Sequence, residues 1–222
     1  MNKIWTFGCS FSSGHLDVPK EKTYSNLIAN ELNYDIENLA KAGHSNDKIL
    51  YDLITNLKNI NDGDIVFFQF STFNRIGHFI DDDIYFSTAG ITELGVKHKM
   101  KENIFSDIPE HDLEILFDYI LSWQDKRRKF DLDNSLNLLD YLKQIKNIKC
   151  FVLYLSNEYY KITDNTLILP IKNNLNNVSI NDFVIENKLT LSDDFPEKYS
   201  YFDSHPGISG HEELKKNILN KL

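Results

Sequence analysis

Short apolar runs occur along this chain at the lengths expected of strands. Four to eight mostly apolar residues in succession, ending at glycine or polar turn residues, are typical of strands buried on both faces of a parallel sheet. The runs that fit this description are 4–7, 36–40, 65–70 and 148–155, of which 36–40 is the weakest.

Between these runs the apolar residues return every three or four positions, which is the spacing of one face of a helix. Ile49, Leu53 and Leu57 form such a stripe after the second run. The helices predicted in this way cover 24–32, 46–57, 113–129, 132–145 and 210–222.

The alternation of strands and helices predicts an α/β fold. In this fold, a three-layer αβα sandwich, helices cover both faces of a mainly parallel sheet. We find no internal repeat and no linker, so residues 1–222 are expected to form a single domain. The stretch of about 71–109 fits neither pattern and is expected to be a long insertion at one end of the sheet, a length that is uncommon for loops without a function.

Polar or glycine residues follow three of the predicted strands. Ser10 comes after the first strand, Gly43 after the second, and Ser71–Arg75 directly after the third. The carboxyl ends of parallel strands share one edge of a sheet, and the active sites of such folds lie at that edge. These three stretches are therefore expected to converge.

Composition narrows the classes of function. The 222 residues carry a formal net charge of −9 and a pI near 5.2, which argues against binding to nucleic acid or to anionic membranes. No apolar run approaches the roughly 18 residues of a membrane-spanning helix, and no signal segment is visible. We expect a cytoplasmic protein, with a virus-encoded origin left open. Cys9 and Cys150 are expected to be buried free thiols.

Ser10 lies at the turn that ends the first strand. A serine hydroxyl becomes a nucleophile when a base removes its proton. A strand-to-helix turn exposes such a side chain and aims the next backbone N–H groups at the reaction centre, and Gly8 leaves the turn free of a Cβ atom. The alternative is a helix N-cap serine, and the local residues favour neither interpretation.

Asp203 and His205 stand two residues apart near the other end of the chain. This spacing lets the carboxylate reach one ring nitrogen and leave the other free, and Pro206 stiffens the turn. Serine, histidine and aspartate are the three parts of a nucleophilic hydrolase, but only folding could bring these three together. The alternative for the pair is a surface loop with a capping aspartate.

Three blocks of the sequence resemble those of the SGNH (GDSL-type) hydrolase superfamily. Phe7–Ser12 is similar to the first block, Gly-Asp-Ser after the first strand, with Cys9 in place of an aspartate that flanks the nucleophile and takes no part in the triad. Asn38–Asn46 resembles the second block, and Asp203–Pro206 the last. The blocks occur in the family's order and span nearly the whole chain.

The resemblance implies a fold and a set of roles. The fold is an SGNH-hydrolase-like sandwich of flavodoxin-like topology. Ser10 is expected to be the nucleophile, His205 the base and Asp203 the carboxylate that orients it. The backbone N–H groups of Ser10 and Gly43 are expected to form the oxyanion hole together with Asn74.

The third block departs from the family pattern of Gly-x-Asn-Asp, in which the asparagine is an oxyanion donor. In Ser71–Arg75 an ungapped alignment puts Phe73 on the donor position. We expect Asn74 to serve through a one-residue bulge, and Ser71, Thr72 and Arg75 are the alternatives.

The function that the resemblance implies is that of a serine esterase. Small acyl esters are the expected substrates, O-acetyl groups on carbohydrate among them, with no metal and no organic cofactor. His44, Asn46 and Arg75 are expected to line the substrate pocket. Two other functions stay open: an O-acyltransferase that uses a glycan hydroxyl in place of water, and a catalytically inactive carbohydrate-binding or virion structural module. The expected partner is a small-molecule or glycan ester, and the oligomeric state is not predicted.

Overall fold

A computed structural model describes residues 2–71, 76–79, 85–88, 130, 132–155, 180–199 and 203–222. Within these residues, four parallel strands form one sheet in the order β2-β1-β3-β6. The strands are β1 (Lys3–Phe7), β2 (Asp35–Asn38), β3 (Ile65–Phe70) and β6 (Lys149–Tyr154). The first described strand lies between the second and the third, which is the flavodoxin-like order of doubly wound folds. The predicted α/β fold with a parallel sheet is confirmed.

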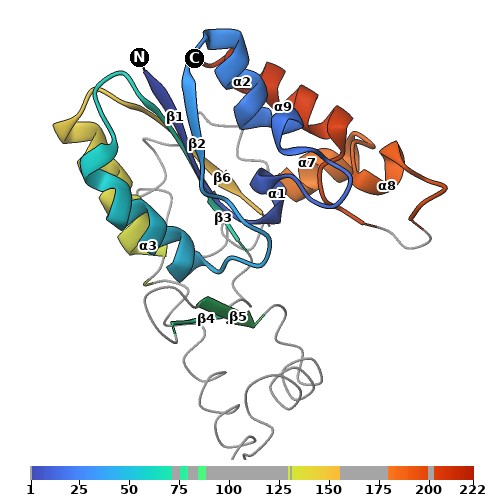
Figure 1. Ribbon diagram of the computed structural model, residues 1–222, viewed down its shortest axis with the longest axis horizontal. Helices are drawn as coiled ribbons and strands as arrows, with labels where there is room; N and C mark the ends of the chain where they lie inside the picture. The colour runs from blue at the N-terminus through green and yellow to red at the C-terminus, as the bar shows by residue number, and fades with distance from the viewer. Residues whose placement is uncertain are drawn as a thin grey trace, which may run out of the picture.

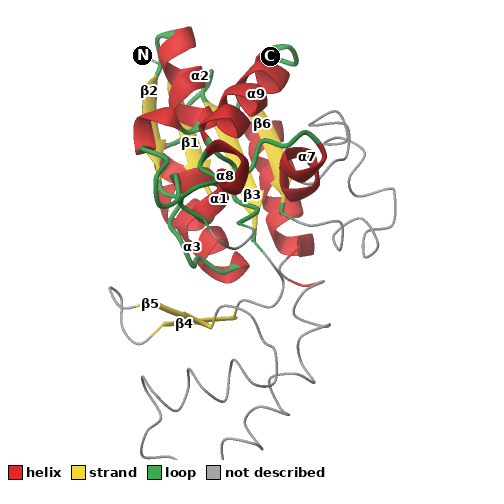
Figure 2. Cartoon of the chain, turned by 90° about the vertical axis from the view of Figure 1, so that its right-hand side faces the viewer, coloured by secondary structure: helices red, strands yellow, loops and turns green. Residues whose placement is uncertain are grey.

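Helices cover both faces of this sheet (Figure 1). One face is covered by α3 (Asn46–Asn56) and by a helix over 132–145. The other face is covered by α2 (Tyr24–Leu32), α7 (Ile180–Glu186) and α9 (Ile208–Leu219), which lie in front of the strands in Figure 2. The sheet therefore forms the middle layer of a three-layer sandwich.

Shorter elements complete the described part of the chain. They connect the main helices and strands, except for one pair of strands that forms a separate antiparallel sheet, β4-β5. These elements are α1 (Ser10–Ser13), α8 (Leu191–Asp194), the 3₁₀ turns η1 (Lys20–Lys22) and η2 (Leu57–Asn59), β4 (Ile76–Phe79) and β5 (Tyr85–Thr88).

The burial of β3 explains why its sequence is almost entirely apolar. All six residues of β3 are buried. Alternate side chains enter opposite cores: Phe67 packs on the side of α2 and α9, while Phe68 and Phe70 pack on the side of α3. A strand covered on both faces has no solvent side, so the usual alternation of apolar and polar residues is lost.

The predicted bounds hold best where the apolar pattern is complete. Tyr24–Leu32 and Ile65–Phe70 have the predicted bounds, residue for residue. The second strand ends at Asn38, two residues before the predicted end, because the Asn38 side chain accepts a hydrogen bond from the Ala40 N–H at 3.1 Å and turns the chain. The last helix begins two residues earlier than predicted and ends at Leu219.

The predicted helix over 113–129 lies outside the described residues. Of the predicted insertion over about 71–109, the structure describes only Ser71, β4 and β5.

Two expectations drawn from composition can be compared with the described residues. Cys9 and Cys150 are buried thiols outside any disulfide, as predicted. Burial raises the pKa of the Cys150 thiol to about 12, so this thiol stays protonated at neutral pH. In the described parts of the chain, no helix combines the length and the apolar character needed to cross a membrane.

Candidate active site

Ser10, His205 and Asp203 meet at the carboxyl edge of the sheet. The Ser10 Oγ atom lies 2.8 Å from Nε2 of His205, across a sequence separation of 195 residues. The Nδ1 atom of the same ring lies 2.6 Å from Oδ1 of Asp203. An ionised carboxylate only accepts hydrogen bonds, so Nδ1 carries the ring proton and Nε2 is left to accept the serine hydroxyl. This order of groups can activate a serine for attack on a carbonyl carbon.

The loop that carries Asp203 and His205 is fixed by its own hydrogen bonds. Asp203 Oδ1 also accepts the backbone N–H of His205 at 3.0 Å, and the Asp203 N–H donates to Ser192 Oγ at 2.6 Å. The Leu191 N–H donates to the His205 carbonyl at 2.7 Å, which ties the loop to α8. Burial raises the pKa of Asp203, but the hydrogen bonds from His205 outweigh burial and hold the pKa below its ordinary value. The carboxylate is therefore ionised at neutral pH and is not part of an open surface loop.

The turn that carries Ser10 differs from the N-cap alternative. Ser10 is the first residue of α1, and the N-cap position is occupied by Cys9, whose side chain makes no capping hydrogen bond. The Ser10 side chain is only 3% exposed and its hydroxyl faces His205, not its own helix. The alternative of a capping serine therefore does not hold. The first N–H groups of a helix have no partner inside it, so the Ser10 N–H is not used by α1.

Gln69 holds this turn in place, and the sequence interpretation did not identify it. Its Oε1 atom accepts the Cys9 N–H at 2.9 Å and the Ser12 hydroxyl at 3.2 Å, and its Nε2 donates to the Phe70 carbonyl at 2.6 Å. A Cβ atom on Gly8 would lie 2.8 Å from Oε1, so a larger residue there would push aside the amide that holds the turn. The signal was present in the sequence, because Gln69 is the one polar residue of the buried strand β3.

The loop of the second sequence block packs against the same turn. The Asn38 side chain donates to the Ser12 carbonyl at 3.0 Å, and the Lys41 N–H donates to the Gly8 carbonyl at 3.3 Å. Gly43 follows in the left-handed region, with φ of +84°, and a Cβ atom there would meet no neighbour within 4 Å. Glycine is therefore favoured at this position by its backbone conformation, and not by crowding.

Two residues expected to line the substrate pocket have structural contacts. Asn46 accepts the Ser71 N–H at 2.7 Å and donates to the Ser71 carbonyl at 3.3 Å, so its amide fixes the end of β3. His44 is buried, and its Nδ1 lies 3.6 Å from Oδ2 of Asp52. Burial raises the pKa of Asp52, although the Lys48 ammonium opposes this. A contact of His44 or Asn46 with substrate stays a prediction.

The remaining expected site residues, Asn74 and Arg75, lie outside the described residues. Their expected roles as oxyanion donor and substrate contact stay predictions. Ser71, which precedes them, is buried at the end of β3. Ser71 itself thus lies at the same edge of the sheet as Ser10.

Two aromatic rings contact His205, and neither was expected from the sequence. The ring of His15 stacks on it with centroids 3.9 Å apart and an interplanar angle of 23°. The ring of Phe11 lies at 4.3 Å and 36°. The Nε2 atom of His15 is 4.0 Å from Oδ2 of Asp203. No spacing rule identifies these contacts, because they join segments from opposite ends of the chain.

The same cluster bears on metal binding. Among the described residues, one group of three or more histidine, cysteine or carboxylate side chains is close enough to share a cation, and it consists of His15, Asp203 and His205. Hydrogen bonds already occupy both ring nitrogens of His205 and one oxygen of Asp203. We therefore interpret the cluster as a hydrogen-bonded triad with a neighbouring histidine.

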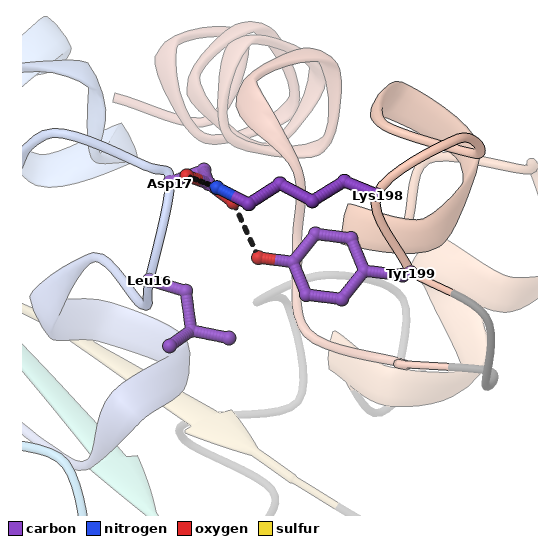
Figure 3. A pocket seen from close by; sticks show the side chains of 4 residues that line it. All are labelled: Leu16, Asp17, Lys198 and Tyr199. Atoms are coloured by element: carbon purple, nitrogen blue, oxygen red, sulfur yellow. Dashed lines mark hydrogen bonds and ion pairs between the residues drawn. The ribbon is translucent and has the colours of Figure 1, made fainter.

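A hollow adjoins the loop that follows α1 (Figure 3). Leu16, Asp17, Lys198 and Tyr199 line it, and the Asp17 carboxylate binds both the Lys198 ammonium and the Tyr199 hydroxyl. These hydrogen bonds hold the pKa of Asp17 below its ordinary value. Leu16 has a φ of +49° and is 62% exposed. The contacts join the loop after His15 to the segment that leads to Asp203.

A second buried histidine lies behind the site. His211 of α9 is 1% exposed, and its Nδ1 accepts the backbone N–H of Tyr24 at 3.3 Å. The Tyr24 ring stacks on it at a centroid distance of 5.9 Å. Burial, with a smaller contribution from His205, lowers the pKa of His211 to about 3. The folded protein therefore keeps this imidazole neutral.

The neutral state of His211 predicts a pH-dependent stability. An unfolded chain protonates this histidine below pH ~6.5, whereas the folded chain does so only near pH 3. The contribution of neutral His211 to the free energy of unfolding is thus fully present above pH ~6.5. It is lost as the pH falls toward 3, by at most about 1.4 kcal/mol per pH unit. We expect urea unfolding between pH 7 and 4 to show a shallower loss in His211→Asn, whose amide oxygen can accept the Tyr24 N–H. Equal slopes for the two proteins would contradict this account.

The geometry so far is that of a serine–histidine–aspartate site on a doubly wound α/β fold. No family model matches the chain, and no curated protein matches it. Several solved structures do match. One is a member of the lipolytic protein G-D-S-L family from Veillonella parvula, at 11% identity and a TM-score of 0.45 over 99% of this chain and 97% of that one.

Two further matches are named as esterases. The psychrotrophic esterase EstA from Pseudoalteromonas sp. is 10% identical, with a TM-score of 0.48 over 99% of this chain and 96% of that one. A catalytic mutant of Axe2, an acetylxylan esterase from Geobacillus stearothermophilus, is 13% identical, with a TM-score of 0.43 over 99% and 93%. At such low identities and TM-scores, the chemistry of this chain has to be argued from its own residues.

Proposed function

We propose that this protein is a serine esterase of the SGNH type that hydrolyses small acyl esters. The observation that carries the proposal is the connected set Ser10–His205–Asp203, with distances of 2.8 Å and 2.6 Å between the bonded atoms. The resemblance of the three sequence blocks supports the same function. It also supports O-acetyl groups on carbohydrate as members of the substrate class.

In the first half-reaction the ester is cleaved and the enzyme is acylated. The Ser10 oxygen bonds to the carbonyl carbon while its proton passes to Nε2 of His205. Ionised Asp203 stabilises the imidazolium that forms, because its Oδ1 accepts the Nδ1 proton. The tetrahedral intermediate then collapses, the bond to the alcohol breaks, and His205 gives its proton to the leaving oxygen.

In the second half-reaction water releases the acyl group. His205, neutral again, takes a proton from water as the water oxygen bonds to the acyl carbon. Collapse of the second intermediate breaks the bond to Ser10, which recovers its proton from His205. The products are a carboxylic acid and an alcohol, and the enzyme returns to its starting state.

The negative oxygen of both intermediates needs hydrogen-bond donors. We assign this role to the backbone N–H groups of Ser10 and Gly43 and to the Asn74 side chain. The hydrogen bonds of the second-block loop to Gly8 and Ser12 support this assignment, because they hold the loop of Gly43 against the nucleophile turn. Each such donor is typically worth about 100- to 1000-fold in rate.

The proposal is tested by covalent labelling with a fluorophosphonate. The folded protein is expected to take up one equivalent, and peptide mass spectrometry is expected to find the adduct on Ser10. Heat-denatured protein serves as the control and is expected to stay unlabelled, because reactivity depends on the folded contact with His205. A folded protein that gives no adduct at Ser10 would overturn the proposal.

The substrate class is tested with a series of esters. Hydrolysis of p-nitrophenyl acetate is expected to be faster than that of p-nitrophenyl octanoate, and acetylated xylan is expected to release acetic acid. A clear preference for the long chain would contradict the assignment to small acyl groups while leaving the nucleophile in place.

A further inference from the structure

His15 has two contacts with the triad that the reaction as described does not use. Its ring stacks on His205 with centroids 3.9 Å apart and an interplanar angle of 23°. Its Nε2 atom faces Oδ2 of Asp203, the carboxylate oxygen that His205 does not use, at 4.0 Å. This second separation is longer than a hydrogen bond, so the ring stack is the closer of the two contacts.

An aromatic ring stacked on His205 interacts more strongly with its imidazolium form, which arises during the reaction, than with its neutral form. His205 is neutral when it accepts the Ser10 hydroxyl and becomes a cation when the proton transfers. The face of a neutral aromatic ring attracts a cation placed over it, and the attraction grows where water is excluded. An interaction that is stronger in the transition state than in the ground state raises kcat and leaves the KM largely unchanged.

We propose that His15 is a positioning residue of the catalytic site, acting through its ring. It holds the His205 imidazole in the plane that reaches both Ser10 and Asp203, and the face of the neutral His15 ring stabilises the imidazolium form of His205. This inference rests on the proposed esterase function, since it assigns to His15 a share in the same proton transfer.

The position of His15 in the chain supports this role. It lies directly after Gly14, which ends α1 with a φ of +78°, and a Cβ atom on Gly14 would come within 2.7 Å of the Val18 carbonyl. The next residue, Leu16, is also left-handed, with a φ of +49°. Glycine adopts a positive φ freely, but a leucine there costs conformational energy, and strain of this kind gathers at functional sites. Here it places the His15 ring on the ring of His205.

The inference is tested by separating the ring of His15 from its polar atoms. His15→Ala removes both, while His15→Phe keeps an uncharged aromatic face. Each protein is reacted with a fluorophosphonate to completion to count its active sites, and kcat and KM for p-nitrophenyl acetate are then given per active site. This normalisation removes the effect of any misfolded fraction. Leu16→Asn is the matched control, because it changes an exposed side chain on the same loop and asparagine tolerates the left-handed conformation.

We expect His15→Ala to lower kcat per active site and the rate constant of phosphonylation by about tenfold, with KM within about twofold. His15→Phe is expected to recover both to within about threefold of the wild type, and Leu16→Asn to match it. Equal rates in His15→Ala and the wild type, or equal losses in the alanine and phenylalanine variants, would overturn the inference. Absence of labelling in the wild type would instead overturn the proposed function, so the two failures are distinguishable.

Discussion

Replacing Ser10 with alanine is expected to lower kcat on p-nitrophenyl acetate by about 10⁵- to 10⁶-fold. The Oγ atom that lies 2.8 Å from His205 is the proposed nucleophile, and no other hydroxyl among the described residues is bonded to that ring. The side chain is small and buried, so the alanine variant leaves almost no cavity and should keep its melting temperature within a few degrees.

The matched control for this prediction is Ser13→Ala. Ser13 lies on the same short helix, and its hydroxyl donates only to the carbonyl of Gly14, at 3.1 Å. The kcat of Ser13→Ala is expected to stay within about twofold of the wild type, since the Ser13 hydroxyl takes no part in the proposed proton transfers. If Ser10→Ala kept more than about a hundredth of the wild-type kcat, Ser10 would not be the nucleophile.

A buried network of polar side chains fixes the turn around Ser10. Gln69 accepts from the Cys9 N–H and from Ser12, and the Ser12 oxygen also lies 2.9 Å from the Tyr24 hydroxyl. Burial raises the pKa of Tyr24 beyond its ordinary value, so its hydroxyl stays protonated and can donate within the network. Each polar group of the network thus has a partner, which lets the buried strand β3 carry a glutamine without a large cost in stability.

The parts of the fold that could be predicted from the sequence are those in which one periodic pattern decides the structure. Ile65–Phe70 is apolar throughout because both its faces are covered, and Tyr24–Leu32 carries a full helical stripe; both bounds were correct. The second strand ends two residues before its predicted end because the Asn38 side chain accepts a hydrogen bond from the Ala40 N–H, which no hydrophobic pattern shows.

The residues of the candidate site divide in a similar way. Ser10, Asp203 and His205 could be identified before the structure because each stands in a short block with a recognisable order. Gln69 and His15 could not, because their roles come from contacts with distant segments. Asn46 has a structural contact that its block does not show: its amide is bonded to the backbone of Ser71, and its contact with substrate stays a prediction.

Asp203→Asn is the second change with a large expected effect, about 10⁴-fold in kcat. Asp203 Oδ1 accepts both the ring proton and the backbone N–H of His205, at 2.6 Å and 3.0 Å. An asparagine can present its NH₂ group to Nδ1, and the ring proton then moves to Nε2, where it blocks acceptance of the Ser10 proton. The amide also lacks the negative charge that stabilises the imidazolium. The variant therefore has both the wrong ring tautomer and a less stable imidazolium.

The effect of Asp203→Asn can be separated from a loss of folding by comparison with Asp194→Asn. Asp194 accepts hydrogen bonds from the N–H and the hydroxyl of Ser209, at 3.0 Å and 2.6 Å, and so makes as many local contacts without touching the triad. We expect Asp194→Asn to lower the melting temperature but to keep kcat per active site, counted with a fluorophosphonate. Asp203→Asn is expected to show the reverse: little change in melting temperature and a slow phosphonylation of Ser10.

The difference in kcat between the wild type and Asp203→Asn should also persist throughout the range from pH 6 to 8. The reason is that the low pKa of Asp203 keeps its carboxylate ionised down to acid pH. An advantage that vanished within this range would mean that the Asp203 charge does not act on His205.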